Sequence, residues 1–131
     1  MDINAVFSAI GNDDIDFVQE AIKNGFDINV VHPRSGMIPL ILACQSDSIK
    51  CLGLFLSLGI DPNRKITRQS RVDGRLHRDI FALRHVKSKR AVDLLVAHGA
   101  DLTLVDGNGK TALANAWNDE VRDALRAHGA V

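Results

Sequence analysis

Residues 18–29 read VQEAIKNGFDIN, and residues 52–63 repeat the same pattern as LGLFLSLGIDPN. A third copy, VDLLVAHGADLT, occupies residues 92–103, and a shortened fourth copy, LRAHGAV, occupies residues 125–131. The aligned glycines are 34, 40 and 30 residues apart and lie at Gly25, Gly59, Gly99 and Gly129. Spacings near 33 residues are typical of helical-repeat proteins, so the chain contains four copies of one structural unit.

Each copy predicts a helix that ends at its glycine. Apolar residues recur three and four positions apart, as in Val18, Ala21 and Ile22, and therefore form a stripe along one helix face. Glycine then ends the helix, because it adopts positive φ without steric cost. A second, shorter apolar pattern precedes each helix: Val6, Ala9 and Ile10; Leu40, Ala43 and Cys44; Ile80 and Leu83; Leu113, Ala116 and Trp117. The unit is thus a helix pair, divided by polar turns whose short oxygen-bearing side chains can cap the second helix.

Two stretches match the pattern of a known repeat family. Residues 106–113 read DGNGKTAL and residues 36–40 read GMIPL, and each is followed by the helix and glycine described above. In these features the chain resembles the ankyrin repeat family over nearly its whole length. The resemblance implies an all-α fold, a helical-repeat solenoid with short β-hairpin loops.

The chain also departs from the ankyrin pattern. The family's threonine is present only as Thr111, and its histidine is replaced by Ile41, Phe81 and Ala114. Those side chains normally form hydrogen bonds between repeats, so we expect this stack to depend more on apolar packing. Leu83 and Arg84 stand where two small residues are expected, and we therefore expect the first helix of the third copy to be displaced.

The length predicts a single domain over residues 1–131. A helix pair cannot bury its apolar face alone, so about three or more units must stack and the end units must be polar outside. We divide the domain into an N-terminal capping repeat (1–29), a second repeat (30–63), a third repeat with an enlarged basic hairpin (64–103) and a C-terminal capping repeat (104–131). We expect Trp117 to cover the last layer of the core, and an interface anchor is its less favoured alternative role.

The composition is that of a folded chain, with 46% hydrophobic and 24% charged residues. No apolar run approaches the roughly 18–20 residues of a membrane span, and the N-terminus lacks the basic and apolar regions of a secretion signal. The two cysteines, Cys44 and Cys51, form no CxxC pair and lie within apolar patterns, so we expect free, buried thiols. These features predict a cytoplasmic protein that binds no membrane.

The charges are strongly segregated, although the net charge is zero. Residues 64–90 contain ten basic and two acidic residues, whereas residues 1–63 and 91–131 carry net charges of −5 and −3. The basic segment coincides with the longest interval between the aligned glycines. It is either a solvated loop or a docking surface, because arginine presents a planar fork that suits carboxylates and phosphates.

None of the candidate catalytic or metal-binding motifs has all the residues that its chemistry requires. Residues 106–111 end in GKT, but Leu104 stands where a phosphate-binding loop needs its first glycine. The same stretch fails as a calcium loop, because Lys110 occupies a ligand position and no glutamate closes the site. His77 and His85 have no nucleophile in a suitable sequence context. We therefore predict no enzyme activity, no small-molecule substrate, no cofactor and no metal.

The sequence predicts a module that binds another protein with an acidic surface. The resemblance and the charge pattern together give a partner-binding set: Arg34, Ser35, Met37, Gln45, Ser46, Arg71, Arg75, His77, Arg78, Arg84, His85, Asn108 and Lys110. We expect Arg71, Arg75 and Arg78 to matter most, each pairing with a partner carboxylate.

The kind of binding protein is left open between two alternatives. One is a neutralising inhibitor, such as a bacterial immunity protein to a toxin, and the other is a scaffold or adaptor in signalling. Nucleic acid is a lesser alternative, because the flanking segments are acidic and the basic segment contains a single aromatic residue, Phe81.

Overall fold

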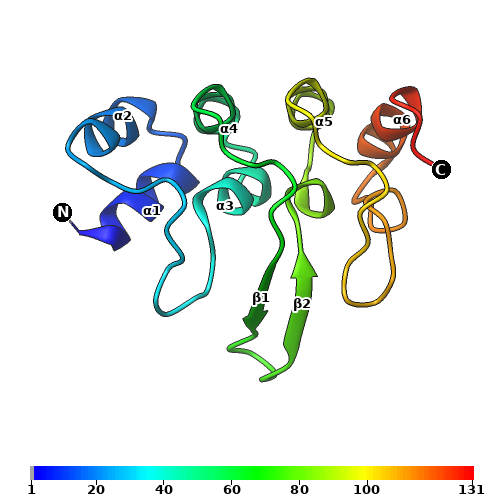
Figure 1. Ribbon diagram of the computed structural model, residues 1–131, viewed down its shortest axis with the longest axis horizontal. Helices are drawn as coiled ribbons and strands as arrows, with labels where there is room; N and C mark the ends of the chain where they lie inside the picture. Colours follow the sequence, from blue (N-terminus) through cyan, green and yellow to red (C-terminus); the bar gives the residue numbers. More distant parts are fainter. Residues whose placement is uncertain (1) are drawn as a thin grey trace.

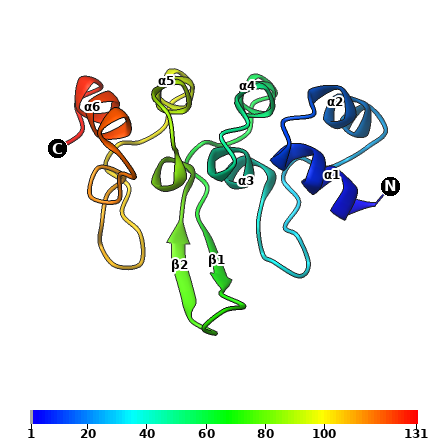
Figure 2. The same ribbon diagram turned by 180° about the vertical axis from the view of Figure 1, so that it is seen from behind.

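The computed structural model describes residues 2–131, which form a single row of stacked helical units. The outer row of helices consists of α2 (Ile15–Lys23), α4 (Ile49–Ser57), α5 (Lys89–Ala97) and α6 (Asp119–Ala127). The inner row consists of α1 (Ile3–Gly11), α3 (Pro39–Gln45) and the 3-10 helix η1 (Ala82–His85). Figures 1 and 2 show the loops between units projecting from the base of the inner row. The predicted helical-repeat solenoid with hairpin loops is confirmed.

The outer helices end as the sequence predicts. Gly25 has a φ of 101° directly after the end of α2, and the N–H of Phe26 donates to the carbonyl of Ala21 at 2.9 Å. This left-handed cap satisfies carbonyl groups that the last turn of a helix leaves free. His98 and His128, which precede the last two cap glycines, are the C-cap residues of α5 and α6.

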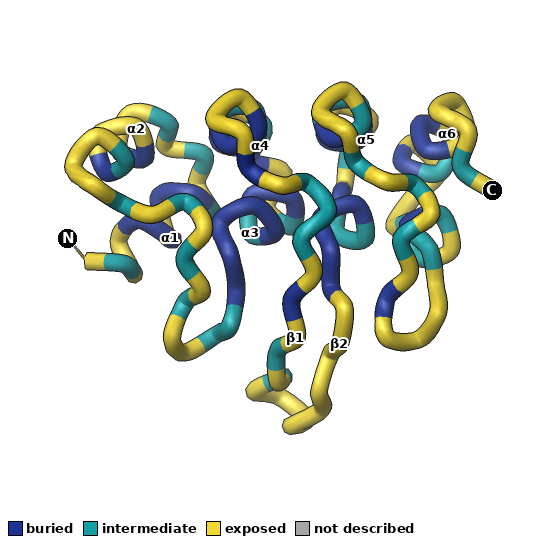
Figure 3. Tube along the Cα trace, viewed as in Figure 1, coloured by how far each residue is buried: buried dark blue, intermediate teal, exposed yellow. Residues whose placement is uncertain are grey.

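The core lies between the two rows of helices and runs the length of the stack (Figure 3). The predicted stripes supply it: Leu52 and Phe55 of α4 are fully buried, as is Val92 of α5. Cys44 and Cys51 are also fully buried free thiols, as predicted. Because each apolar face is covered by the next unit, the units stabilise one another by mutual burial.

More side-chain hydrogen bonds link neighbouring units than the sequence analysis predicts. Helix α4 receives no cap from its own Ser48 side chain. Instead, the carboxylate of Asp13, in the preceding unit, accepts from the backbone N–H groups of Lys50 at 3.2 Å and Cys51 at 2.9 Å. One unit further on, Asp47 accepts a hydrogen bond from Ser88, the N-cap of α5, at 2.7 Å.

The fourth unit lacks the inner helix that its apolar pattern predicts. Residues 112–115 form turns, and Trp117 is 66% exposed, so the prediction that this side chain covers the core is wrong. This copy is the shortest, and the side chain of Asn115 donates to the carbonyl of Thr111 at 3.1 Å before the chain extends into the N-cap of α6. Too few residues separate Thr111 from α6 for a full inner helix. In the third unit the inner element is the single 3-10 turn η1.

Residues 64–80 form the longest of the loops that project from the stack (Figures 1 and 2). Strand β1 (Ile66–Gln69) pairs antiparallel with β2 (Leu76–Ile80), with Ile66 opposite Ile80, Arg68 opposite His77 and Gln69 opposite Leu76. A β-bulge between Ile66 and Arg68 shifts the register. The hairpin lies in the basic segment, as the sequence analysis predicts. No helix among residues 2–131 is long and apolar enough to span a lipid bilayer.

Candidate functional site

The tip of the β1–β2 hairpin presents basic and apolar side chains to solvent. Arg71 is exposed, and the side chain of Arg75 is 82% exposed, with its only nearby carboxylate, Asp73, at 3.9 Å. Val72 lies between them and is 97% exposed. Exposed ion pairs of this kind contribute little to stability, so both arginines are free to pair with another molecule.

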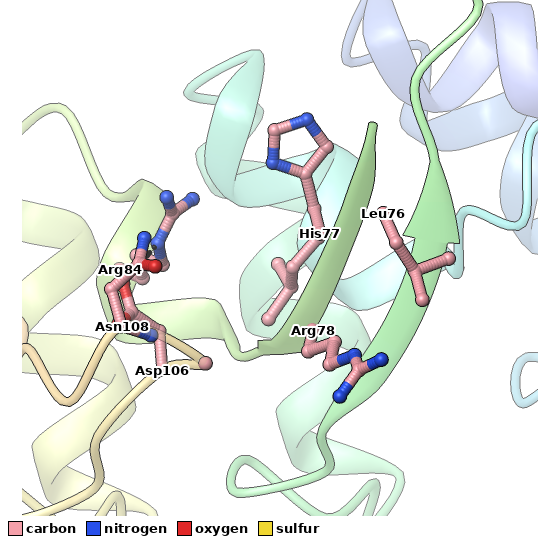
Figure 4. Close-up of a pocket in the computed structure, with 8 residues that line it drawn as sticks. Leu76, His77, Arg78, Arg84, Asp106 and Asn108 are labelled. Atoms are coloured by element: carbon pink, nitrogen blue, oxygen red, sulfur yellow. Dashed lines mark hydrogen bonds and ion pairs between the residues drawn. The ribbon is translucent and has the colours of Figure 1, made fainter. Parts of the chain in front are cut away.

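A second group of basic side chains gathers at the base of the hairpin. We call it the basic groove and define it by Arg68, His77, Arg84 and His85. Figure 4 shows His77 and Arg84 extending to the same side of the hairpin base, whereas Arg78 extends away from them. Successive side chains of a strand point to opposite faces, so the guanidinium of Arg78 extends away from His77, although Arg78 lines the same hollow.

His85 lies at the centre of the basic groove, where its two ring nitrogens have different neighbours. A guanidinium can only donate, so Nε2 of His85 accepts from Nη1 of Arg84 at 3.2 Å. Nδ1 lies 3.3 Å from Nε2 of the Gln45 side-chain amide. Burial, followed by the charges of Arg84 and Arg68, lowers the pKa of His85 to about 4. His85 is therefore neutral at pH 7.

Asp106 fixes the position of Arg84. Its buried carboxylate accepts from Nε of Arg84 at 2.9 Å, from the side chain of Asn115 at 3.0 Å, and from the backbone N–H groups of Asn108 and Lys110 at 2.9 and 3.1 Å. Burial raises the pKa of Asp106, but these hydrogen bonds outweigh it and bring the pKa to about 2. Asp106 thus stays ionised and holds the 106–110 turn and Arg84 in one arrangement.

A hollow of about 270 Å³ separates β2 from the 106–110 turn. Figure 4 shows its lining, which includes Leu76, His77, Arg84 and Asn108. The N–H of Gly107 donates to the carbonyl of Arg78 at 3.0 Å, so the two loops are joined at the floor of the hollow.

A wider hollow of about 430 Å³ lies at the other end of the basic groove, between the first and third units. Phe7, Met37 and Leu42 make its lining largely apolar, and Arg68 and Gln45 form its border toward His85. Met37 is only 5% exposed, so its side chain is part of the core and only its edge reaches the hollow.

Trp117 marks the opposite end, beside η1. With Arg84, His85 and Asn115 it lines a third hollow of about 230 Å³. Nζ of Lys87 lies 5.1 Å from the centre of its ring, a cation–π contact that orients the exposed indole. An exposed tryptophan in a fixed orientation is typical of protein interfaces.

The structure divides the residues that the sequence analysis assigned to partner binding. It brings Ser35, Met37, Gln45, His77, Arg84, His85 and Asn108 to the hollows just described. Arg78 also lines the hollow beside β2, and Arg71 and Arg75 lie at the hairpin tip. Three of the assigned residues line none of these hollows: Arg34, Ser46 and Lys110.

Sequence reasoning missed two residues that the geometry makes prominent. Arg68 was counted only as one of ten basic residues, and its role depends on the bulge in β1, which leaves no clear signal in the sequence. Asp106 was assigned to the stretch that matches the repeat family, where it was rejected as part of a phosphate or calcium loop and given no individual role. The turn residues Asp106, Gly107 and Gly109 were a signal for the structural role that Asp106 has here.

Comparison with known proteins identifies the fold family. The family model for ankyrin repeats in three copies matches residues 1–66. The chain belongs to the ankyrin repeat family. The ankyrin repeat domain of human ASB11 superimposes with a TM-score of 0.76 at 22% identity, covering 96% of this chain and 53% of that one. The ankyrin repeat domain of Bcl-3, described as a unique member of the IkappaB protein family, gives a TM-score of 0.69 at 29% identity and covers 93% of this chain and 50% of that one.

This ankyrin repeat chain therefore spans about half the length of the solved ankyrin domains that it resembles. A search of curated protein sequences gives no match. Stacked repeats of this kind form extended concave surfaces that bind other proteins. In this ankyrin chain, the residues of the basic groove line three hollows beside the hairpin and η1.

Proposed function

We propose that this ankyrin repeat chain is a non-enzymatic module that binds an acidic partner protein through its hairpin loops and concave groove. The observation that supports the proposal most is the long β1–β2 hairpin, which projects beyond the neighbouring loops within a segment of ten basic and two acidic residues (Figure 1). The side chains of Arg71 and Arg75 at its tip have no close carboxylate partner in the described chain except Asp73 at 3.9 Å.

Arginine favours a protein partner with surface carboxylates. Its guanidinium forms two parallel hydrogen bonds to one carboxylate and is enriched among interface residues that carry much of the binding energy. A concentrated positive charge also accelerates association with an acidic protein, and the acceleration weakens as salt is added.

We further propose that the module acts as a neutralising inhibitor, such as a bacterial immunity protein to a toxin, and that it does so in the cytoplasm. A binding surface without catalytic groups acts by covering its partner. The two buried free thiols, Cys44 and Cys51, suit a reducing compartment. The alternative is an ankyrin scaffold or adaptor, which would bind several partners without inhibiting them.

Affinity purification of the full chain from its native cells, followed by mass spectrometry, tests the proposal. A single acidic partner whose activity falls as the ankyrin chain is added supports the inhibitor. Several partners with unchanged activities support the scaffold. Retardation of labelled DNA or RNA that declines steeply with salt would contradict both and indicate nucleic-acid binding.

Charge reversal tests the role of the hairpin. The triple variant Arg71→Glu, Arg75→Glu and Arg78→Glu should lose partner binding while its thermal unfolding stays close to that of the wild type. The matched control, Lys23→Glu, Lys50→Glu and Arg126→Glu, makes the same change in net charge at exposed positions of the outer helices. Equal losses of partner binding in both variants would mean that binding depends on net charge and not on the hairpin residues.

A further inference from the structure

We propose that the basic groove receives an extended segment of the partner protein in which an acidic side chain lies between apolar ones, and that Arg68 is its principal anchor. The proposal rests on the proposed function and makes it specific: it assigns the partner's recognised segment and a binding residue that sequence reasoning did not single out. Three independent features of the groove support it.

The first feature is an unused hydrogen-bond donor. Nε of Arg68 is buried and has no hydrogen-bond partner within residues 2–131. A buried polar group without a partner is costly, and most are satisfied in native structures. A carboxylate that enters the adjacent hollow would pair with this guanidinium.

The second feature is an excess of positive charge. Arg68, Arg84 and Lys87 all lie close enough to His85 to depress its pKa. Among the residues that line the three hollows, the only carboxylate is Asp106, and four donors already occupy its oxygens. Asp106 balances the charge of Arg84, so the positive charges that no lining carboxylate balances are those of Arg68 and Lys87, and an acidic side chain supplied from outside would meet them.

The third feature is the apolar surface at both ends. Phe7, Met37 and Leu42 line the hollow on one side of Arg68, and Trp117 lies beyond His85 on the other. A peptide that crosses the groove can thus bury an apolar side chain at each end while its carboxylate lies in the centre. A nucleic-acid strand would match this surface less well, because its phosphates repeat along the whole strand whereas Phe7, Met37 and Leu42 give the hollow beside Arg68 an apolar lining.

Selection from a library of random dodecapeptides displayed on phage, with the purified full chain as bait, tests the inference without knowledge of the partner. We expect enriched peptides to combine Asp or Glu with neighbouring Leu, Phe or Trp. Binding of the enriched peptides to Arg68→Gln should be about tenfold to a hundredfold weaker than to the wild type, the loss typical of a charge-assisted hydrogen bond. Arg68→Lys, which keeps the charge but loses the fork, should lie between them.

Trp117→Ala is the second test variant, because an exposed side chain can be removed without loss of core packing. It should weaken the same peptides. A failed selection, enriched peptides without acidic residues, or equal binding to wild type and Arg68→Gln would overturn the inference. So would a labelled oligonucleotide that displaces the peptides in an Arg68-dependent manner.

The two proposals fail separately. Loss of partner capture in the hairpin-tip variant, combined with peptide binding that does not depend on Arg68, overturns the groove assignment and leaves the proposed function standing. Peptide binding that depends on Arg68, combined with partner capture that is unaffected by the tip variant, overturns the role of the hairpin tip instead.

Discussion

The carboxylate of Asp13 accepts a hydrogen bond from the backbone N–H of Cys51 at 2.9 Å, across the boundary between the first and second repeats. The same carboxylate accepts from Lys50, so one side chain satisfies two free N–H groups at the N-terminus of α4. Burial, and then the hydrogen bond and charge of Asp13, raise the pKa of the Cys51 thiol to about 12. A helix cap supplied by the neighbouring repeat couples the stability of the two units.

Asp13→Ala should therefore lower the free energy of unfolding by about 1–2 kcal/mol, the usual cost of losing a helix cap. Asp13 has a φ of 55°, so alanine also adds backbone strain, and Asp13→Gly separates the two effects. Asp13→Asn keeps an acceptor and should lose less. Urea denaturation of the three variants measures the differences, and an unchanged midpoint for Asp13→Gly would show that the intermodular cap contributes nothing.

Acid should destabilise the chain through Asp106. Its pKa in the folded state is about 2 and its ordinary value is 3.8, so its contribution is complete above about pH 4 and is lost as the pH falls through 2. The lowered pKa of Asp106 corresponds to about 2 kcal/mol in the free energy of unfolding at neutral pH. Asp106→Asn should be less stable by about that amount at pH 7, and the difference should shrink below about pH 3. A constant difference across the titration would contradict this account.

His85 should act in a separate pH window. Burial and the surrounding cations lower its pKa from 6.5 to about 4, so the unfolded chain binds a proton at His85 before the folded chain does. The free energy of unfolding should therefore fall between about pH 6.5 and 4 because of this group. His85→Gln should remove that part of the pH dependence. Equal pH profiles for wild type and His85→Gln would refute the assignment.

Gly107 joins the 106–110 turn to the hairpin, and a side chain there has no room. A Cβ at this position would lie 2.8 Å from Cβ of Arg78 and 3.0 Å from its carbonyl oxygen. Gly107→Ala should lower the free energy of unfolding by about 1–3 kcal/mol. The matched control is Gly53→Ala in α4, where nothing lies within 4 Å and alanine should stabilise the helix by about 1 kcal/mol. Calorimetric melting of the two variants should therefore shift in opposite directions.

The order and ends of the outer helices could be predicted from the sequence, because they depend on local features. Apolar residues spaced by one helical turn, as in Leu52 and Phe55, are buried in the structure, and Gly25 takes the left-handed conformation expected of it. The inner helix of the fourth unit was predicted incorrectly, since a chain shortened between Thr111 and α6 has no room for it. The spacing of apolar residues predicts a helix but does not show whether the chain is long enough to form it.

The sequence by itself determined a stack of ankyrin repeats with a basic hairpin, because helix periodicity, glycine caps and charge are properties of neighbouring residues. Only the tertiary structure decided which basic residues act together. The pairing of β1 with β2 places Arg68 and His77 near His85, whereas the guanidinium of Arg78 extends away from His77. Asp106 then fixes Arg84 across 22 positions of sequence, a contact that exists only once the units have stacked.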